Sequence, residues 1–173
     1  MLQTERLVLR PLAVTDLETT HTYASDPENT QYMIYLPNQN KEETAQFLQR
    51  ASSEWLKDEP SFYEFAITLD GAHIGAASIH IDEECELGWI LHKAYHGHGY
   101  ATEAAKVVLD FAVQTRGAKR VIAHCDQENI ASQRVMEKLG MTLAHSNGIR
   151  RNRASNVDSF ECKYALDIPT TPM

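Results

Sequence analysis

The strongest constraint on the fold lies in residues 86–116, where a strand-like run, a glycine tract and a helical pattern follow one another directly. The run "ELGWIL" has the length and the bulky apolar residues of a buried strand. After the tract "HKAYHGHG", residues 100–116 carry apolar side chains at helical spacing, and Gly117 is placed to end that helix. A strand that enters a helix through glycines predicts an α/β domain.

The rest of the chain extends this unit into one mixed α/β domain. Asp70-Gly71 lies between two strand-like runs and is a strong hairpin signal. Asp16 and Asn129 each stand where a helix N-cap is expected. We expect residues 1–173 to form a single domain, because a chain of this size can bury a full core. The expected strands are 6–12, 62–69, 72–81, 84–91, 120–125, 141–149 and 158–168, and the expected helices are 17–23, 41–60, 100–116 and 129–140.

Charge and apolar patterning exclude several classes of partner. The net charge of -8 argues against binding to a nucleic-acid backbone, which requires clustered Lys and Arg. No apolar run approaches membrane-spanning length, and charged residues interrupt the first twelve positions where a secretory segment would be apolar. Three widely spaced cysteines, Cys85, Cys125 and Cys162, indicate buried reduced thiols. These features predict a cytoplasmic protein with no membrane or direct nucleic-acid partner.

The glycine tract has three interpretations from its residues alone. His92, His96 and His98 could bind a metal, although their spacing matches no common zinc motif. Gly97 and Gly99 could instead let backbone N–H groups approach an anion at the start of a helix. A plain strand-to-helix turn would use glycine as well.

The wider sequence favours the anion-binding interpretation. "HGHGYA" resembles the Arg/Gln-x-x-Gly-x-Gly/Ala signature of the GNAT superfamily of acetyl-CoA-dependent N-acetyltransferases, with Gly99 and Ala101 at its small-residue positions. His96 occupies the usual Arg/Gln position, which is a departure from the signature. Similar segments occur in order along most of the chain and resemble the RimJ/RimL-type ribosomal-protein N-terminal acetyltransferase branch: "TERLVLRPL", "ELGWIL", "GYATEA", "ENIASQRVMEKLGM" and the "RRN" turn before "YAL".

The resemblance implies a fold and a cosubstrate. The fold is an α/β, single-domain GNAT-like fold, with a mixed, mostly antiparallel central sheet, helices on both faces and a splayed strand pair that holds the cofactor. The cosubstrate is acetyl-CoA, and no metal is implied. Trp89, Ile90 and Leu91 would hold the pantetheine arm through their backbone, and an N–H there would face the acetyl oxygen. The pyrophosphate would bind the loop formed by His96, Gly97, His98, Gly99, Tyr100, Ala101 and Thr102.

Three further residues receive roles from the same resemblance. Asn129 would donate a hydrogen bond to the pantetheine arm, with helix capping as the alternative. Glu86 would accept the amine proton directly or through water, or would only bond neighbouring groups in its strand. Ser132 would protonate the departing thiolate, because Met136 stands where many superfamily members place a tyrosine; the alternative is a serine that caps the helix backbone.

The resemblance implies direct attack of a primary amine on acetyl-CoA in a ternary complex. The acceptor would be a protein N-terminal α-amine, with a small-molecule amine or antibiotic as the alternative, and the oligomeric state would be monomer or homodimer. A non-catalytic acyl-CoA-binding module is the second class considered. The three arginines Arg150, Arg151 and Arg153 are expected in a solvated turn.

Overall fold

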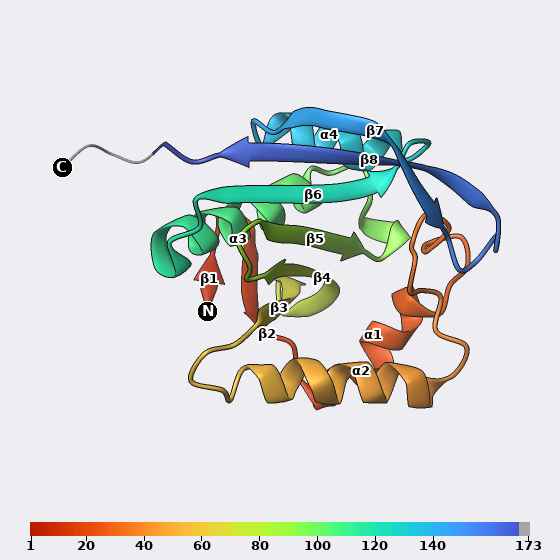
Figure 1. Ribbon diagram of the computed structural model, residues 1–173. Helices are drawn as coiled ribbons and strands as arrows, with labels where there is room; N and C mark the ends of the chain where they lie inside the picture. Colours follow the sequence, from red (N-terminus) through yellow and green to blue (C-terminus); the bar gives the residue numbers. More distant parts are fainter. Residues whose placement is uncertain (170–173) are drawn as a thin grey trace.

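The computed structural model describes residues 1–169, which form one eight-stranded sheet with helices on both faces (Figure 1). The last four residues of the expected 1–173 domain lie outside the described range. The strands are β1 (Leu2–Gln3), β2 (Leu7–Pro11), β3 (Phe62–Leu69), β4 (Ala72–His80), β5 (Cys85–Leu91), β6 (Arg120–Asp126), β7 (Thr142–Arg151) and β8 (Asp158–Asp167). The helices are α1 (Leu17–Ala24), α2 (Lys41–Glu54), α3 (Tyr100–Arg116) and α4 (Ile130–Lys138), with short 3-10 turns η1 (Val14–Asp16) and η2 (Lys93–Tyr95).

The sheet has the order β1-β2-β3-β4-β5-β6-β8-β7 and is antiparallel except between β5 and β6. Those two strands pair only at Cys85 with Val121 and at Glu86 with Ile122. Beyond Glu86 their backbones separate, although both strands continue toward the same end of the sheet (Figure 1). The expected mixed, mostly antiparallel sheet with one splayed pair is therefore confirmed.

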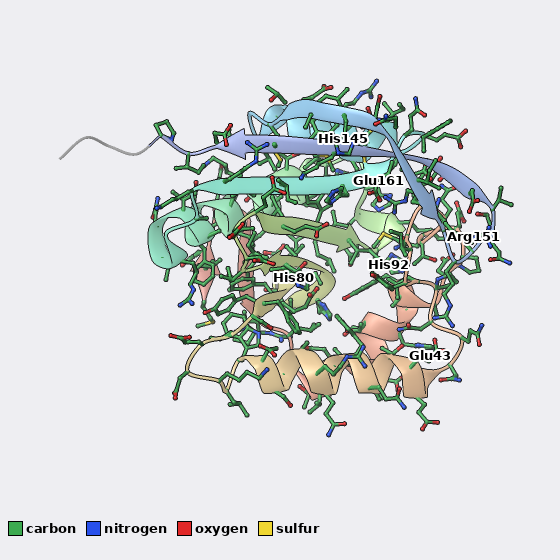
Figure 2. The ribbon with its side chains drawn as sticks, in the orientation of Figure 1. Glu43, His80, His92, His145, Arg151 and Glu161 are labelled. Carbon is green, nitrogen blue, oxygen red and sulfur yellow. The ribbon has the colours of Figure 1, made fainter. Side chains whose placement is uncertain are left out.

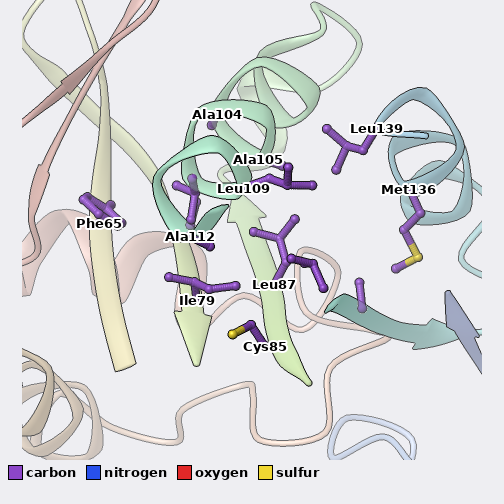
Figure 3. Packing of buried hydrophobic residues seen from close by; sticks show 14 of the residues in the cluster. Phe65, Ile79, Cys85, Leu87, Ala104, Ala105, Leu109, Ala112, Met136 and Leu139 are labelled. Atoms are coloured by element: carbon purple, nitrogen blue, oxygen red, sulfur yellow. The ribbon is translucent and has the colours of Figure 1, made fainter. Parts of the chain in front are cut away.

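Helices cover the two faces of the sheet with separate apolar clusters. On one face α3 packs small residues against β3, β4 and β5, and Figure 3 shows Ala104, Leu109 and Ala112 next to Ile79 and Leu87. On the other face Leu48 of α2 packs with Leu12 and Ala66. Alternation along each strand explains this division, because successive side chains point to opposite faces. On β3, for example, Phe65 belongs to the cluster that contains the buried residues of α3, whereas the next residue, Ala66, packs against Leu48 of α2.

Local signals place the turns correctly and some boundaries incorrectly. Asp70 and Gly71 both have positive φ, 50° and 83°, as a two-residue hairpin of the predicted kind requires. Asp16 stands at the N-cap of α1, but its carboxylate accepts from Arg10 and from the Ala13 N–H instead of capping the helix. The helix expected to continue to Pro60 ends at Glu54.

The three cysteines are buried and free, as their apolar surroundings predicted. Burial raises the pKa of the Cys125 thiol to about 12 and also raises the pKa of Cys162. Within residues 1–169, no helix combines the length and hydropathy needed to cross a membrane.

Candidate active site

The site begins where β5 leaves β6. Glu86 is the last residue of β5 that pairs with β6. The backbone of β5 beyond it has no partner strand on the β6 side; this free edge includes Gly88, Trp89, Ile90 and Leu91. On its other side β5 remains fully paired with β4 through Leu91. An extended ligand could therefore pair with this free edge as an added strand does. This free edge contains Trp89, Ile90 and Leu91, the strand residues predicted to hold pantetheine, and also Gly88, which was not predicted.

The glycine loop connects β5 to α3 and exposes backbone donors. Gly97 and Gly99 have φ of +81° and +82°, a conformation that L side chains rarely adopt. Gly99 is the N-cap of α3, and the first bond within the helix runs from the Glu103 N–H to the Gly99 carbonyl at 3.1 Å. The N–H groups of residues 100–102 consequently have no partner within the helix. With the positive end of the helix dipole, they form a suitable anion site.

The three histidines of the tract face different partners. His92 Nδ1 accepts from the Ala94 N–H at 3.1 Å, and His96 Nε2 donates to the Leu91 carbonyl at 3.0 Å. The ring of His98 lies 5.6 Å from the ring of Tyr100. Within residues 1–169, no three His, Cys, Asp or Glu side chains lie close enough together to hold a metal ion. At the position where the family signature has Arg or Gln, His96 thus fastens the loop to the end of β5.

Arg6, which sequence reasoning missed, contacts this loop as one member of an ion pair with Glu103. Its Nη1 donates to the His98 carbonyl at 3.0 Å, and its guanidinium lies 4.6 Å from the centroid of the Tyr100 ring. Glu103 in the first turn of α3 holds Arg6 through a 2.7 Å bond from Nε. Because Arg6 is far from the tract in sequence, no local motif could identify it.

Asn129 and Ser132 lie at the start of α4, directly after β6. The Asn129 side-chain oxygen accepts from the Ser132 N–H at 3.1 Å, so the predicted cap is present. The amide NH2 of Asn129 and the hydroxyl of Ser132 have no hydrogen-bond partner among residues 1–169. Helix capping therefore occupies only the side-chain oxygen of Asn129. The Asn129 NH2 and the Ser132 hydroxyl remain available for the ligand roles predicted for them.

Glu86 lies in the paired part of β5 and bonds to a histidine on the neighbouring strand. His124 Nδ1 donates to Glu86 Oε1 at 2.8 Å, and the Glu86 side chain is 48% exposed. This hydrogen bond lowers the pKa of Glu86, with smaller contributions from the charges of His80 and Lys163. The same bond raises the pKa of His124. Glu86 is not among the residues that line the cavity described next.

A cavity of about 470 Å³ lies between α1, α2 and the sheet. Its walls are mainly apolar, and it reaches β5 at Gly88, Trp89 and Ile90, where the two strands separate. Two aromatic side chains, Tyr35 and Trp89, line it. The other lining residues are Thr20, Tyr23, Ala24, Met33, Ile34, Leu36, Asn38, Glu43, Gln46, Phe47, Arg50, Glu64, Ala76, Ser78 and Arg153.

The arginines expected in a solvated turn instead connect the sheet to the cavity wall. Arg150 is only 8% exposed and donates to the carbonyl of Tyr32 at 2.7 Å. Arg153 pairs with Glu43 of α2 at 3.0 Å and lines the cavity. In Figure 2, Glu43, His92 and Arg151 lie at one end of the sheet, the end at which β5 finishes. Of the three arginines, Arg151 keeps the predicted exposed position and pairs with Asp158.

Comparisons with known proteins agree with this geometry. Residues 6–142 match the family model described as an acetyltransferase (GNAT) domain. An uncharacterised N-acetyltransferase of Bacillus subtilis, YnaD, is 31% identical over 140 residues, which cover 80% of each chain. The crystal structure of a GNAT-family acetyltransferase from Bacillus anthracis superposes with a TM-score of 0.83 at 28% identity, covering 96% of this chain and 97% of that one. The ribosomal L7/L12 α-N-protein acetyltransferase RimL, solved with coenzyme A, shares the fold at 18% identity, with a TM-score of 0.80 and coverage of 95% and 96%.

Proposed function

We propose that this chain, which belongs to the GNAT family of acetyl-CoA-dependent N-acetyltransferases, acetylates a primary amine. The amine would bind in the cavity beside β5. The observation that carries the proposal is that the cavity and the unpaired edge of β5 share Gly88, Trp89 and Ile90. An acyl group held along that edge and an amine in the cavity would meet at the same stretch of strand. Such positioning accounts for much of the rate of a transfer between two bound reactants.

The cosubstrate would contact three groups of residues. The backbone of Trp89, Ile90 and Leu91 would hold the pantetheine arm, and the Asn129 NH2 would donate to it. The loop from His96 to Thr102 would bind the pyrophosphate through the free N–H groups at the start of α3, and Arg6 would hold the loop in place through the His98 carbonyl. The bound thioester supplies an activated acetyl carbon; the protein supplies orientation and hydrogen bonds.

Transfer would proceed by direct attack in a ternary complex. A covalent route through the enzyme would need a nucleophile with a populated thiolate form. Burial instead keeps Cys125 protonated by raising its pKa to about 12, and the other two cysteines are buried as well. None of the three lines the cavity.

The roles of the two candidate catalytic side chains stay predictions. Ser132 has a free hydroxyl at the start of α4 and would give a proton to the leaving thiolate. Glu86 is the base that family resemblance suggests, directly or through water, but His124 holds its carboxylate and it is not among the residues that line the cavity. Ser132→Ala is expected to lower turnover and leave coenzyme A affinity unchanged.

The acceptor would be a protein N-terminal α-amine or a small amine. Either fits an apolar cavity open to solvent, and the choice depends on loops 25–40 and 145–157, which differ readily between proteins. The cytoplasmic location and the monomer or homodimer state also stay predictions. A non-catalytic acyl-CoA-binding module would bind coenzyme A without turnover.

The test is acetylation of an amine panel by the purified protein. The panel contains peptides with free N-termini, an N-terminally blocked lysine peptide and small amines, and product is measured as free thiol and as an acetyl mass gain. Ile34→Trp would narrow the cavity and is expected to lower kcat/KM for the amine, with the KM for acetyl-CoA unchanged. Val14→Trp is the matched control, since Val14 is exposed and outside the cavity. Coenzyme A binding without acetylation of any amine would contradict the proposal.

A further inference from the structure

Glu64 occupies the floor of the cavity, opposite the proposed acetyl site. Strand register places Glu64 beside Ser78 on β4, and Ser78 beside Gly88 on β5. All three line the cavity. Since neighbouring strands lie about 4.8 Å apart, the Glu64 and Gly88 Cα atoms are roughly 10 Å apart. An amine nitrogen could therefore lie between the Glu64 carboxyl group and the free edge of β5.

Three oxygen-bearing side chains line this cavity. The carboxyl group of Glu64 makes no hydrogen bond or ion pair with residues 1–169. The hydroxyls of Thr20 and Tyr23 are buried, lie close to each other and have no other hydrogen-bond partner within that range. Thr20 and Tyr23 are 1% and 3% exposed, and both line the cavity. The two buried hydroxyls keep hydrogen-bonding capacity beside the partly buried Glu64 carboxyl group, and this combination on one cavity suits a polar ligand.

The ligand that suits this set is a primary ammonium group. It carries three N–H donors and one positive charge, and the three side chains offer two hydroxyl oxygens and one carboxylate as acceptors. The surrounding wall is apolar and includes Met33, Phe47 and Ile90, which suits an amine with an apolar body.

No cationic side chain pairs with the Glu64 carboxyl group within residues 1–169, and burial favours its protonated form. Burial raises the pKa of Glu64 to about 8. Tyr23 on α1 has a pKa raised by burial, with smaller effects from the charges of Glu64 and Asp16. On α2, Glu43 is neutralised by Arg153, and Arg50 lines the cavity as the other cationic side chain. An α-amine has a pKa of about 7.7–8.0, so proton transfer from such an amine to Glu64 would be nearly balanced.

We propose that Glu64 accepts the proton that the acceptor ammonium must lose before it attacks, while the hydroxyls of Thr20 and Tyr23 hold the nitrogen. This inference rests on the proposed function. The ammonium passes one proton to the Glu64 carboxylate and becomes a neutral amine. Its nitrogen then bonds to the acetyl carbon of acetyl-CoA, and the carbon–sulfur bond breaks with its electron pair going to sulfur. The thiolate receives the second nitrogen proton, and Glu64 later returns its proton to solvent.

The experiment compares Glu64→Gln with Glu86→Gln, the residue suggested by family resemblance. Initial rates are measured from pH 6 to pH 9.5 with saturating acetyl-CoA and the best amine of the panel. Glu64→Gln should lower kcat/KM by roughly 100-fold or more, and its remaining rate should rise with pH only as the fraction of neutral amine rises, so that the wild-type ascending limb is replaced by one that follows the pKa of the amine supplied. Glu86→Gln should keep the wild-type limb. With an aromatic amine, which is unprotonated throughout this range, the deficit of Glu64→Gln should shrink to below about 10-fold, since no proton has to leave before attack.

Tyr23→Phe provides a second readout with little change in volume. It should raise the KM for the amine several-fold and leave the KM for acetyl-CoA unchanged. An unaltered rate and pH profile in Glu64→Gln would overturn the inference while leaving the proposed function intact, and so would loss of the limb in Glu86→Gln alone. A wild-type protein that acetylates no amine would refute the proposed function and the inference together. Unfolding midpoints and coenzyme A binding of each variant establish that the fold is retained.

Discussion

Replacing Glu64 by Gln is expected to change how stability depends on pH. Glu64 has a folded-state pKa of about 8, against an ordinary value of 4.5. Because the folded state binds the proton more tightly than the unfolded state, this group's contribution is full below about pH 4.5 and is lost as pH rises toward the folded pKa. Gln has the same shape and does not titrate, so the variant lacks this dependence.

The magnitude follows from the two pKa values. Each pH unit between them costs the wild-type protein up to about 1.4 kcal/mol of unfolding free energy, which sets an upper limit of roughly 5 kcal/mol. Over the practical range from pH 6 to pH 9, linkage gives a loss of roughly 2 to 3 kcal/mol in the wild-type protein relative to Glu64→Gln. The variant should therefore gain stability over the wild type as pH rises.

Urea unfolding followed by circular dichroism at pH 6 and pH 9 measures this difference. Glu42→Gln is the control, because Glu42 is exposed on the same side of the sheet, on α2, and makes no ion pair within residues 1–169. Its difference from the wild type should be the same at both pH values. If the difference between Glu64→Gln and wild type changes by less than about 0.5 kcal/mol, Glu64 is not in the apolar environment that the linkage argument requires.

Three other substitutions test the Glu86–His124 pair, the glycine loop and the packing of β4 against β5. Glu86→Gln should cost less than about 1 kcal/mol near pH 5.5 and almost nothing at pH 9. Because the pKa of His124 is raised and that of Glu86 is lowered, the stabilisation by this partly exposed pair is fully present between about pH 4.5 and 6.5 and is lost as pH rises through the folded-state pKa of His124; denaturant unfolding at both pH values measures it. Gly99→Ala should cost about 1–2 kcal/mol and weaken coenzyme A binding, because φ there is +82°, and calorimetry with coenzyme A would show an unchanged affinity if the loop is not the anion site. Gly75→Ala should destabilise by roughly 2 kcal/mol or more, since its Cβ would overlap the Ile90 carbonyl, and a wild-type unfolding midpoint would contradict that clash.

Local sequence signals predicted most of the fold and the glycine loop that precedes α3. The hairpin at Asp70-Gly71, the cap at Asn129 and the glycines before α3 each depend on residues only a few positions apart, so their chemistry is readable from the chain. The splayed strand pair was predicted from the family resemblance, and the limited pairing of β5 with β6 confirms that prediction. The predicted roles of Glu86 and Ser132 have not been tested.

The acceptor side could not be found in this way. Glu64 looks like an ordinary polar residue on a strand, and its character arises from α1 and α2, which cover that face of the sheet. Arg150 and Arg153 looked like a solvated cluster because their partners, at Tyr32 and Glu43, lie more than a hundred residues away in sequence. Arg6 likewise contacts His98 of the glycine loop, which lies 92 residues later in the sequence.

The sequence by itself determined the α/β class, the order of most elements and the glycine loop that prepares backbone donors, because these depend on interactions among near neighbours in the chain. The tertiary structure alone decided which side chains share the cavity, which carboxyl group lacks a partner and which arginines are buried. Those properties depend on strand register and on which helix covers each face of the sheet, and both are fixed only when distant segments pack together.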